Sequence, residues 1–336
     1  QKILSFIYFL IIILVFVSIT KRVIGPSNYD IVIYGGEVYD GSGGESVIQD
    51  IGIIGDKIVK VGKIEFNNSK RIIDASGLVV SPGFIDTHAH LDPMDNLIKL
   101  SNSESHVRQG VTTSFGGPDG RGVPLKYGFK EFLDTIEVVG VGMNMGFLTG
   151  HNKIRRVVMN LENRDPTDDE LQQMKYLASK AMDEGAFGIS TGLKYLPGNF
   201  SKVEEVIEIS KEISKKGGVY TSHLRDEGLK IIDAVEEAIQ ISKEADISVV
   251  LTHHKVIGKP MWGKSEITLS LIDSARQKGI KVMADQYPYS ASHTGINVLI
   301  PTWARAGGSE DFKKRVLDKS LREKIEEEII FNILND

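Results

Sequence analysis

The most informative stretch of this chain is residues 79–92, which read VVSPGFIDTHAHLD. In it, an apolar run of the β type leads to His88 and His90, which one residue separates. Alternate side chains of a strand lie on the same face, so the two imidazoles are predicted to point the same way. Two ring nitrogens that converge at the end of a buried strand suit a divalent transition metal. The stretch therefore predicts part of a metal site.

Two further histidines also follow apolar, strand-like runs. His223 ends the run GVYTSH, and His253 ends the run ISVVLTH. Each is predicted to lie where a buried strand meets its loop, as His88 and His90 do. In barrel enzymes the active-site residues come from the carboxyl ends of several different strands.

Composition limits the classes of function. With 336 residues, of which 41% are hydrophobic, the chain can bury a large core, and its length allows two domains. The net charge of -5 and the pI near 6.0 provide no basic surface, so nucleic acid is not expected as a partner. Cysteine is absent, which excludes disulfides, a thiolate nucleophile and sulfur ligands. Any metal must be held by nitrogen and oxygen.

Residues 1–22 are predicted to be a signal peptide or a single membrane anchor. Residues 3–19 form an almost unbroken apolar run with basic residues on both sides. This length and these flanks are typical of both kinds of segment. Export to the periplasm or the extracellular space and attachment to a membrane both remain open, because no clear small-x-small cleavage site follows.

Residues 29–80 are predicted to form a small antiparallel β domain. Period-2 alternation between glycine-rich turns indicates short strands, and these are expected at residues 30–34, 46–54, 57–61 and 71–74.

Residues 81–336 show a different pattern, in which strands and helices alternate. Apolar strand-like runs occupy residues 111–115, 145–149, 187–191, 219–223, 249–253 and 281–287. Together with the run before His88 they give seven strand–helix units. This count favours an α/β fold of the (β/α)8 barrel type over an open doubly wound sheet, since no phosphate-binding glycine fingerprint follows the first strand. The eighth strand is not visible.

The sequence predicts where two helices in this region begin. Residues 167–170 read TDDE, and residues 201–204 read SKVE. Both fit the capping box, in which a hydroxyl and a glutamate satisfy the first free amide groups of a helix.

The sequence resembles the amidohydrolase superfamily, which consists of metal-dependent hydrolases with a (β/α)8 barrel beside a small β-sandwich. Within that superfamily it is similar to the N-acyl-D-amino-acid deacylases over residues 29–303. The segments that carry this similarity are GISTGLKYLPG (188–198), TSHLRDE (221–227), THHK (252–255) and DQYPY (285–289). The resemblance implies hydrolysis of the amide bond of an N-acyl-D-amino acid, a small molecule, to a carboxylate and a free D-amino acid.

The resemblance also implies the metal ligands. His88 and His90 would hold one zinc ion, and His223 and His253 would hold a second, more tightly bound one. The family has a cysteine after the second strand, where this chain has Asp119 in the sequence GPDG. Asp119 is therefore the candidate fifth ligand or bridge, although a plain Pro-Asp-Gly turn is the alternative. A carboxylate is a harder donor than a thiolate, so the preference among zinc, manganese and iron is expected to differ.

A substrate carboxylate needs a cation with hydroxyl groups beside it. Lys255, Tyr195 and Tyr287 resemble the family's carboxylate-binding positions, and Arg225 is a further candidate. The alternative for the two cationic residues is pairing with an acidic side chain at the surface.

Three functions remain open from the sequence. The first is the deacylase, and the second is another amidohydrolase, namely a dipeptidase or a cyclic amidase. No lysine ends the strand at residues 187–191, which disfavours the subgroup whose metals are bridged by a carboxylated lysine. In the deacylase family an aspartate at the end of the eighth strand moves protons, and no such motif occurs before Asp336. The chain is therefore expected to be C-terminally truncated, and an inactive remnant is the third alternative, unless Asp285 replaces that aspartate.

Overall fold

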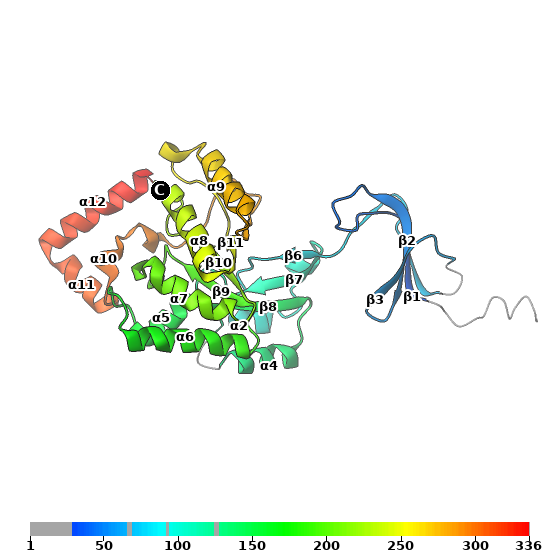
Figure 1. Cartoon of the computed structure of the whole chain (residues 1–336), viewed down its shortest axis with the longest axis horizontal. Coiled ribbons are helices and arrows are strands. Elements are labelled where there is room, and N and C mark those ends of the chain that lie inside the picture. Colours follow the sequence, from blue (N-terminus) through cyan, green and yellow to red (C-terminus); the bar gives the residue numbers. More distant parts are fainter. Residues whose placement is uncertain (1–28, 66–68, 92–93, 124–127, 336) are drawn as a thin grey trace, which may run out of the picture. The chain divides into compact units, whose positions relative to one another are not determined.

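The computed structural model describes residues 29–65, 69–91, 94–123 and 128–335, in two compact units that divide between Gly83 and Phe84 (Figure 1). The predicted signal or anchor segment, residues 1–22, lies outside the described residues. Within the described part of the chain, no helix combines the length and the apolar character needed to cross a bilayer.

The first unit contains one five-stranded sheet. Its strands are β1 (Tyr29–Val38), β2 (Val47–Ile54), β3 (Lys57–Gly62), β4 (Ser69–Asp74) and β5 (Val79–Val80). The order is β3-β2-β1-β4, and β5 also pairs with β1. The pairs β1–β2 and β2–β3 are antiparallel, but β4 and β5 run parallel to β1. The prediction of a purely antiparallel domain is wrong, because alternation identifies a strand without giving the direction of a neighbour that no hairpin joins to it.

Strand β1 continues through two glycines that were expected to end it. The register of the β1–β2 pair shifts between Ile33 and Gly36, which marks a bulge. Gly35 has a φ of 70°, and its amide donates to Oδ1 of Asp50 over 2.9 Å. Glycine is suited to this left-handed conformation, so the strand bends there and continues.

The second unit is built on seven parallel strands, as predicted. These are β6 (Phe84–Asp86), β7 (Val111–Gly116), β8 (Asn144–Gly150), β9 (Gly188–Gly192), β10 (Val219–His223), β11 (Ser248–Leu251) and β12 (Val282–Ala284). Their order in the sheet is the order in the chain, β12 to β6, with parallel pairing throughout. A curled sheet with this order is that of a (β/α)8 barrel, which confirms the predicted fold class.

Helices α2 to α9 lie between successive strands of this sheet, and α10 to α12 follow its last strand, β12 (Figure 1). They are α2 (Met94–Lys99), α3 (Glu104–Val107), α4 (Phe129–Val139), α5 (His151–Met159), α6 (Asp168–Asp183), α7 (Val203–Ser214), α8 (Ile231–Ala245), α9 (Ser265–Gln277), α10 (Thr302–Arg305), α11 (Ser309–Leu317) and α12 (Lys319–Asn335). The described residues also form the short 3-10 helices η3 (Gly198–Phe200), η4 (Lys259–Met261) and η5 (Ile296–Leu299).

The main core lies between the sheet and helices α6 to α8. Ile189, Tyr220 and Val249 from three neighbouring strands are fully or almost fully buried, and Met174 and Ile209 from the helices belong to the same cluster. Burial of such side chains contributes about 1.5–3 kcal/mol each. The packing holds the strands in register, so their carboxyl ends meet at one edge of the sheet.

One of the two predicted capping boxes is present. The Thr167 hydroxyl accepts from the Glu170 amide, and the Glu170 carboxylate accepts from the Thr167 amide. The second prediction, at residues 201–204, is wrong. Lys202 is the N-cap of α7, and the Ser201 hydroxyl instead donates to the Gly198 carbonyl over 2.5 Å. The hydroxyl is used to close η3, so it is not available to α7.

Candidate metal centre

Five predicted ligands lie at the carboxyl ends of four strands of the parallel sheet. His88 and His90 follow β6, Asp119 follows β7, His223 ends β10, and His253 follows β11. All four strands belong to the same parallel sheet, so their carboxyl ends, and these side chains, lie at one edge of it. This is the position at which barrel enzymes carry their active sites.

The four imidazoles form two close pairs that touch each other. Nε2 of His88 lies 3.3 Å from Nε2 of His90, and Nδ1 of His223 lies 2.7 Å from Nε2 of His253. The ring centroids of His88 and His253 are 5.0 Å apart, which joins the pairs. The structure therefore brings all four histidines together, as the sequence predicts.

Asp119 lies at the centre of this histidine cluster. Its Oδ1 is 3.6 Å from Nδ1 of His223 and 3.7 Å from Nε2 of both His88 and His253. Its Oδ2 is 3.2 Å from Nε2 of His90. The carboxylate thus faces all four rings.

The distances from Asp119 to the four rings fit a metal ion between the side chains, whereas the 2.7 Å between Nδ1 of His223 and Nε2 of His253 would have to lengthen. Two ligand atoms that each lie about 2.1 Å from a tetrahedral ion are about 3.4 Å apart. Oδ1 of Asp119 is also fully buried without a hydrogen-bond partner, a condition that normally costs free energy and calls for an explanation. A cation bound by nitrogen and oxygen would satisfy this atom.

The backbone around Asp119 is held by its neighbours. Asp119 itself has a φ of 55°, so it does lie in a tight turn, but the turn aims its side chain at the histidines. The Ser190 hydroxyl donates to the Gly117 carbonyl over 2.6 Å and accepts from the Gly120 amide over 3.0 Å. Ser190 on β9 therefore fixes the loop that carries the carboxylate.

His88 and His90 converge for a reason other than the predicted one. The apolar stretch is not one strand, because β5 pairs in the first unit and β6 ends at Asp86, before either histidine. The amide of His88 donates to Oδ1 of Asp86 over 3.0 Å, which turns the chain directly after β6. The alternation argument is therefore wrong, and the turn brings the rings together.

His253 also lies beyond its strand, since β11 ends at Leu251. Its φ is 41°, in the left-handed region that costs an ordinary residue about 1 kcal/mol or more. The His253 amide donates to Oδ1 of Asp285 over 2.5 Å. Oδ2 of the same carboxylate lies 3.8 Å from Nδ1 of His88. Asp285 thus holds the backbone of one candidate ligand and faces the ring of another.

The charges of the cluster favour a cation. Burial lowers the pKa of His88 to about 4, although Asp119 acts in the opposite direction. Burial alone would raise the pKa of Asp119, but the facing imidazoles of His223, His253 and His90 hold it well below its usual range. Burial would also lower the pKa of His253, but Asp119 and Glu227 raise it to about 9. The carboxylates of Asp119 and Glu227 therefore favour positive charge in the region of His253.

Glu227 is a member of the site to which the sequence analysis assigned no role, although it ends the segment TSHLRDE (221–227). It follows β10, and its Oε1 lies 2.9 Å from Nδ1 of His253 and 2.5 Å from Nζ of Lys255. Together with His223 and His253 it forms a group of three donor residues whose ligand atoms lie within 4.8 Å of one another. Its place four residues after His223, in a loop at a strand end, is the one signal that could have identified it.

Three of the four predicted substrate-binding residues lie beside the histidines. The ring centroid of Tyr195 is 4.5 Å from that of His223, and the centroid of Tyr287 is 6.5 Å from that of His253. Nζ of Lys255 lies 5.5 Å from the centroid of Tyr287, whose hydroxyl is buried without a hydrogen-bond partner. A cation and a phenol hydroxyl thus lie next to the cluster, and the ammonium is paired with Glu227.

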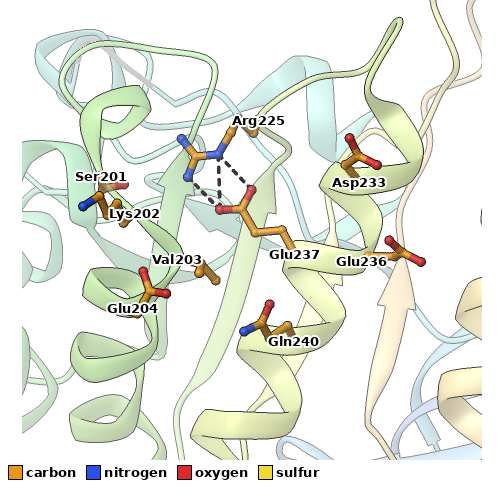
Figure 2. Close-up of a pocket in the computed structure, with 9 residues that line it drawn as sticks. All are labelled: Ser201, Lys202, Val203, Glu204, Arg225, Asp233, Glu236, Glu237 and Gln240. Atoms are coloured by element: carbon orange, nitrogen blue, oxygen red, sulfur yellow. Dashed lines mark hydrogen bonds and ion pairs between the residues drawn. The ribbon is translucent and has the colours of Figure 1, made fainter.

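Arg225 has a different environment (Figure 2). Its guanidinium donates to both carboxylate oxygens of Glu237 on α8 and to the Asn199 carbonyl. It lines a surface pocket of about 540 Å³ between α7 and α8, together with Glu204 and Asp233. Binding of a substrate carboxylate by Arg225 stays a prediction, and it would require this ion pair to open.

Comparison with known proteins identifies relatives over about four fifths of the chain. No family model matches the chain. The D-aminoacylase of Alcaligenes xylosoxydans xylosoxydans is 37% identical over 286 residues, which are 79% of this chain and 58% of that protein. The N-acyl-D-glutamate deacylase of the same organism is 33% identical over 81% of this chain and 59% of its own length.

A solved structure gives the same result. The N-acyl-D-glutamate deacylase from Bordetella bronchiseptica, complexed with zinc and a phosphonate inhibitor, has a TM-score of 0.74 and 30% identity, and the match covers 78% of this chain and 59% of that one. The chain thus spans somewhat less than three fifths of the length of these relatives. By sequence and by fold, it belongs to the amidohydrolase superfamily, in the family that contains the D-aminoacylases and the N-acyl-D-amino-acid deacylases.

Proposed function

We propose that this protein binds one or two zinc ions and hydrolyses the amide bond of N-acyl-D-amino acids. The observation that carries the proposal is the convergence of His88, His90, His223 and His253 on the buried carboxylate of Asp119. Nitrogen and oxygen donors at this spacing suit zinc. The identity to D-aminoacylase supports the reaction class.

The ion would supply Lewis-acid polarisation of the acyl carbonyl and activation of water. The residues of the chain bind and orient the substrate around it. Lys255 and the hydroxyl of Tyr287 lie where they could hold a carboxylate, since the ammonium provides charge and the buried hydroxyl lacks a partner. Tyr195 packs against the ring of His223, so its side chain also lies beside the metal position.

The substrate class is supported by the form of the site. A free carboxylate on the substrate could share the ammonium of Lys255 with Glu227, since Nζ lies beside the cluster, 3.1 Å from Nδ1 of His253. Strand β9 ends in Ser190, Thr191 and Gly192, so it provides no lysine for a carboxylated bridge. This disfavours the cyclic amidases that use such a bridge.

An assay panel tests this proposal. The full-length, zinc-loaded protein is expected to release free amino acids from N-acetyl-D-amino acids and much less from their L-enantiomers. Dipeptides and hydantoins serve as the competing substrates. Turnover of hydantoins or dipeptides alone would contradict the deacylase assignment and favour a cyclic amidase or a dipeptidase.

We further propose that residues 1–22 direct export or anchor the protein in a membrane. The support is the apolar run at residues 3–19 and its basic flanks. Cell fractionation with N-terminal sequencing of the mature protein tests this. Recovery of the intact segment in the cytoplasmic fraction would contradict it.

A further inference from the structure

We infer that Glu227 is a positioning residue that orients the ring of His253, so that Nε2 of His253 faces the metal position. The inference rests on the proposed metal centre, and it adds a carboxylate to which the resemblance assigns no role. Glu227 is buried, with 9% of its side chain exposed, and it makes its contact on the far side of the ring from Asp119.

The two nitrogens of His253 face different partners. Nε2 lies 2.7 Å from Nδ1 of His223 and 3.7 Å from Oδ1 of Asp119, whereas Nδ1 lies 2.9 Å from Oε1 of Glu227. A carboxylate that accepts the Nδ1 hydrogen leaves the lone pair on Nε2, where a metal needs it. The arrangement has the form of a carboxylate–histidine–metal triad.

Lys255 makes this contact necessary. Its Nζ lies 3.1 Å from the same Nδ1, and an ammonium group can only donate hydrogen bonds. If Lys255 donated to Nδ1, the ring hydrogen would be on Nε2, and no lone pair would face the metal position. Oε1 of Glu227 lies 2.5 Å from Nζ, so the carboxylate draws the lysine to itself and keeps Nδ1 as a donor.

The backbone holds Glu227 where it can do this. Oδ1 of Asp226 accepts from the amides of Gly228 and Lys230, each over 2.9 Å, which fixes the turn after β10. The carbonyl of Glu227 accepts from the amide of Ile257 over 2.8 Å. The loops after β10 and β11 are thus joined, and the carboxylate is placed before any ion binds.

A second carboxylate of the chain provides a matched control. Glu205 on α7 is also buried between an imidazole and a cation, with Oε1 2.8 Å from Nε2 of His151 and 3.1 Å from Nε of Arg155. The contacts that the structure gives His151 do not include any member of the histidine cluster. Glu205→Gln should therefore reproduce the cost of removing a buried charge without changing a metal ligand.

The test compares metal binding by the wild type, Glu227→Gln and Glu205→Gln. Competition with a chelator gives the zinc Kd, and the visible spectrum of the cobalt-substituted protein reports the ligand geometry. Glu227→Gln is expected to weaken zinc binding by about 10–100-fold, the usual effect of losing such an outer carboxylate, and to alter the cobalt spectrum. Glu205→Gln is expected to change neither quantity.

A double variant keeps the test valid if Glu227→Gln alone does not fold. Glu227→Gln combined with Lys255→Met leaves no unpaired charge at this position. Zinc binding should remain weakened, because no carboxylate accepts the Nδ1 hydrogen of His253 and orients its ring. Unchanged zinc affinity and cobalt spectrum in the folded Glu227 variants would overturn the positioning role. Failure of the wild type itself to bind zinc would instead overturn the proposed function.

Discussion

The Nδ1 atom of His223 lies 2.7 Å from the Nε2 atom of His253, although the two are 30 positions apart in sequence. His223 ends β10, and His253 lies two residues beyond the end of the neighbouring strand β11. Two ring nitrogens that face each other this closely can share one hydrogen bond at most, so a metal ion between slightly separated rings would satisfy both nitrogens. This pair is the part of the proposed centre on which the others depend.

Removal of either ring should abolish tight metal binding. His223→Ala and His253→Ala each delete one ligand nitrogen, and elemental analysis of the purified protein should show less zinc per chain. The control is His254→Ala. His254 is adjacent in sequence, but its Nε2 lies 2.9 Å from the Thr268 hydroxyl instead. Equal zinc loss in all three variants would indicate general unfolding and contradict the assignment.

Replacement of Asp119 by cysteine should change metal selectivity. A thiolate is a softer donor than a carboxylate, so Asp119→Cys is expected to favour zinc over manganese more strongly than the wild type does. The φ of 55° at this position is less favourable for cysteine than for aspartate, and a modest loss of stability is expected as well. Competitive loading with both metals measures the ratio. An unchanged ratio would mean that residue 119 is not a ligand.

Lys255→Met should weaken substrate binding through the carboxylate. The KM for an N-acetyl-D-amino acid is expected to rise. The KM for the analogue whose α-carboxylate is replaced by an uncharged carboxamide should change little. Lys259→Met, at an exposed position in η4, is the control. A loss of the same size for both substrates would show that Lys255 acts on the metal centre and not on the carboxylate.

The packing around Asp119 should not tolerate one additional methyl group. A Cβ added at Gly192 on β9 would meet the carbonyl oxygen of Asp119 and the ring of Tyr195. Gly192→Ala is therefore expected to reduce the free energy of unfolding by about 1–3 kcal/mol and to weaken zinc binding. Gly44→Ala, where the Cβ meets only the Ser42 hydroxyl, should change neither. Urea denaturation and zinc titration of both variants decide this.

The buried carboxylate of Glu205 should make stability depend on pH. Burial alone would raise its pKa, but His151 and Arg155 hold the pKa below its usual value. The stabilisation is then complete above the unfolded pKa of about 4.3, and it is lost as the pH falls through the folded pKa. The difference in unfolding free energy between wild type and Glu205→Gln should shrink between pH 7 and acid pH. A constant difference would show that the carboxylate does not titrate with folding.

The fold class and most of the site follow from local sequence, because strand-like runs and the polar residues at their ends are local patterns. His223 was recognisable in this way. Features that depend on residues distant in sequence could not be predicted in this way. The direction of β4 depends on pairing with β1, and the role of the Ser201 hydroxyl depends on the preceding turn. Glu227 lies four residues after His223, but its role became visible only from the 2.9 Å between its Oε1 and Nδ1 of His253.

The most direct test of the account is a crystal structure of the zinc-soaked protein with anomalous scattering recorded at the zinc edge. A zinc peak is expected within about 2.0–2.2 Å of ring nitrogens of His223 and His253, with the carboxylate of Asp119 beside it. A second peak near His88 and His90 would complete the centre. An anomalous map that places zinc elsewhere, or shows none at these four histidines, would contradict the central claim.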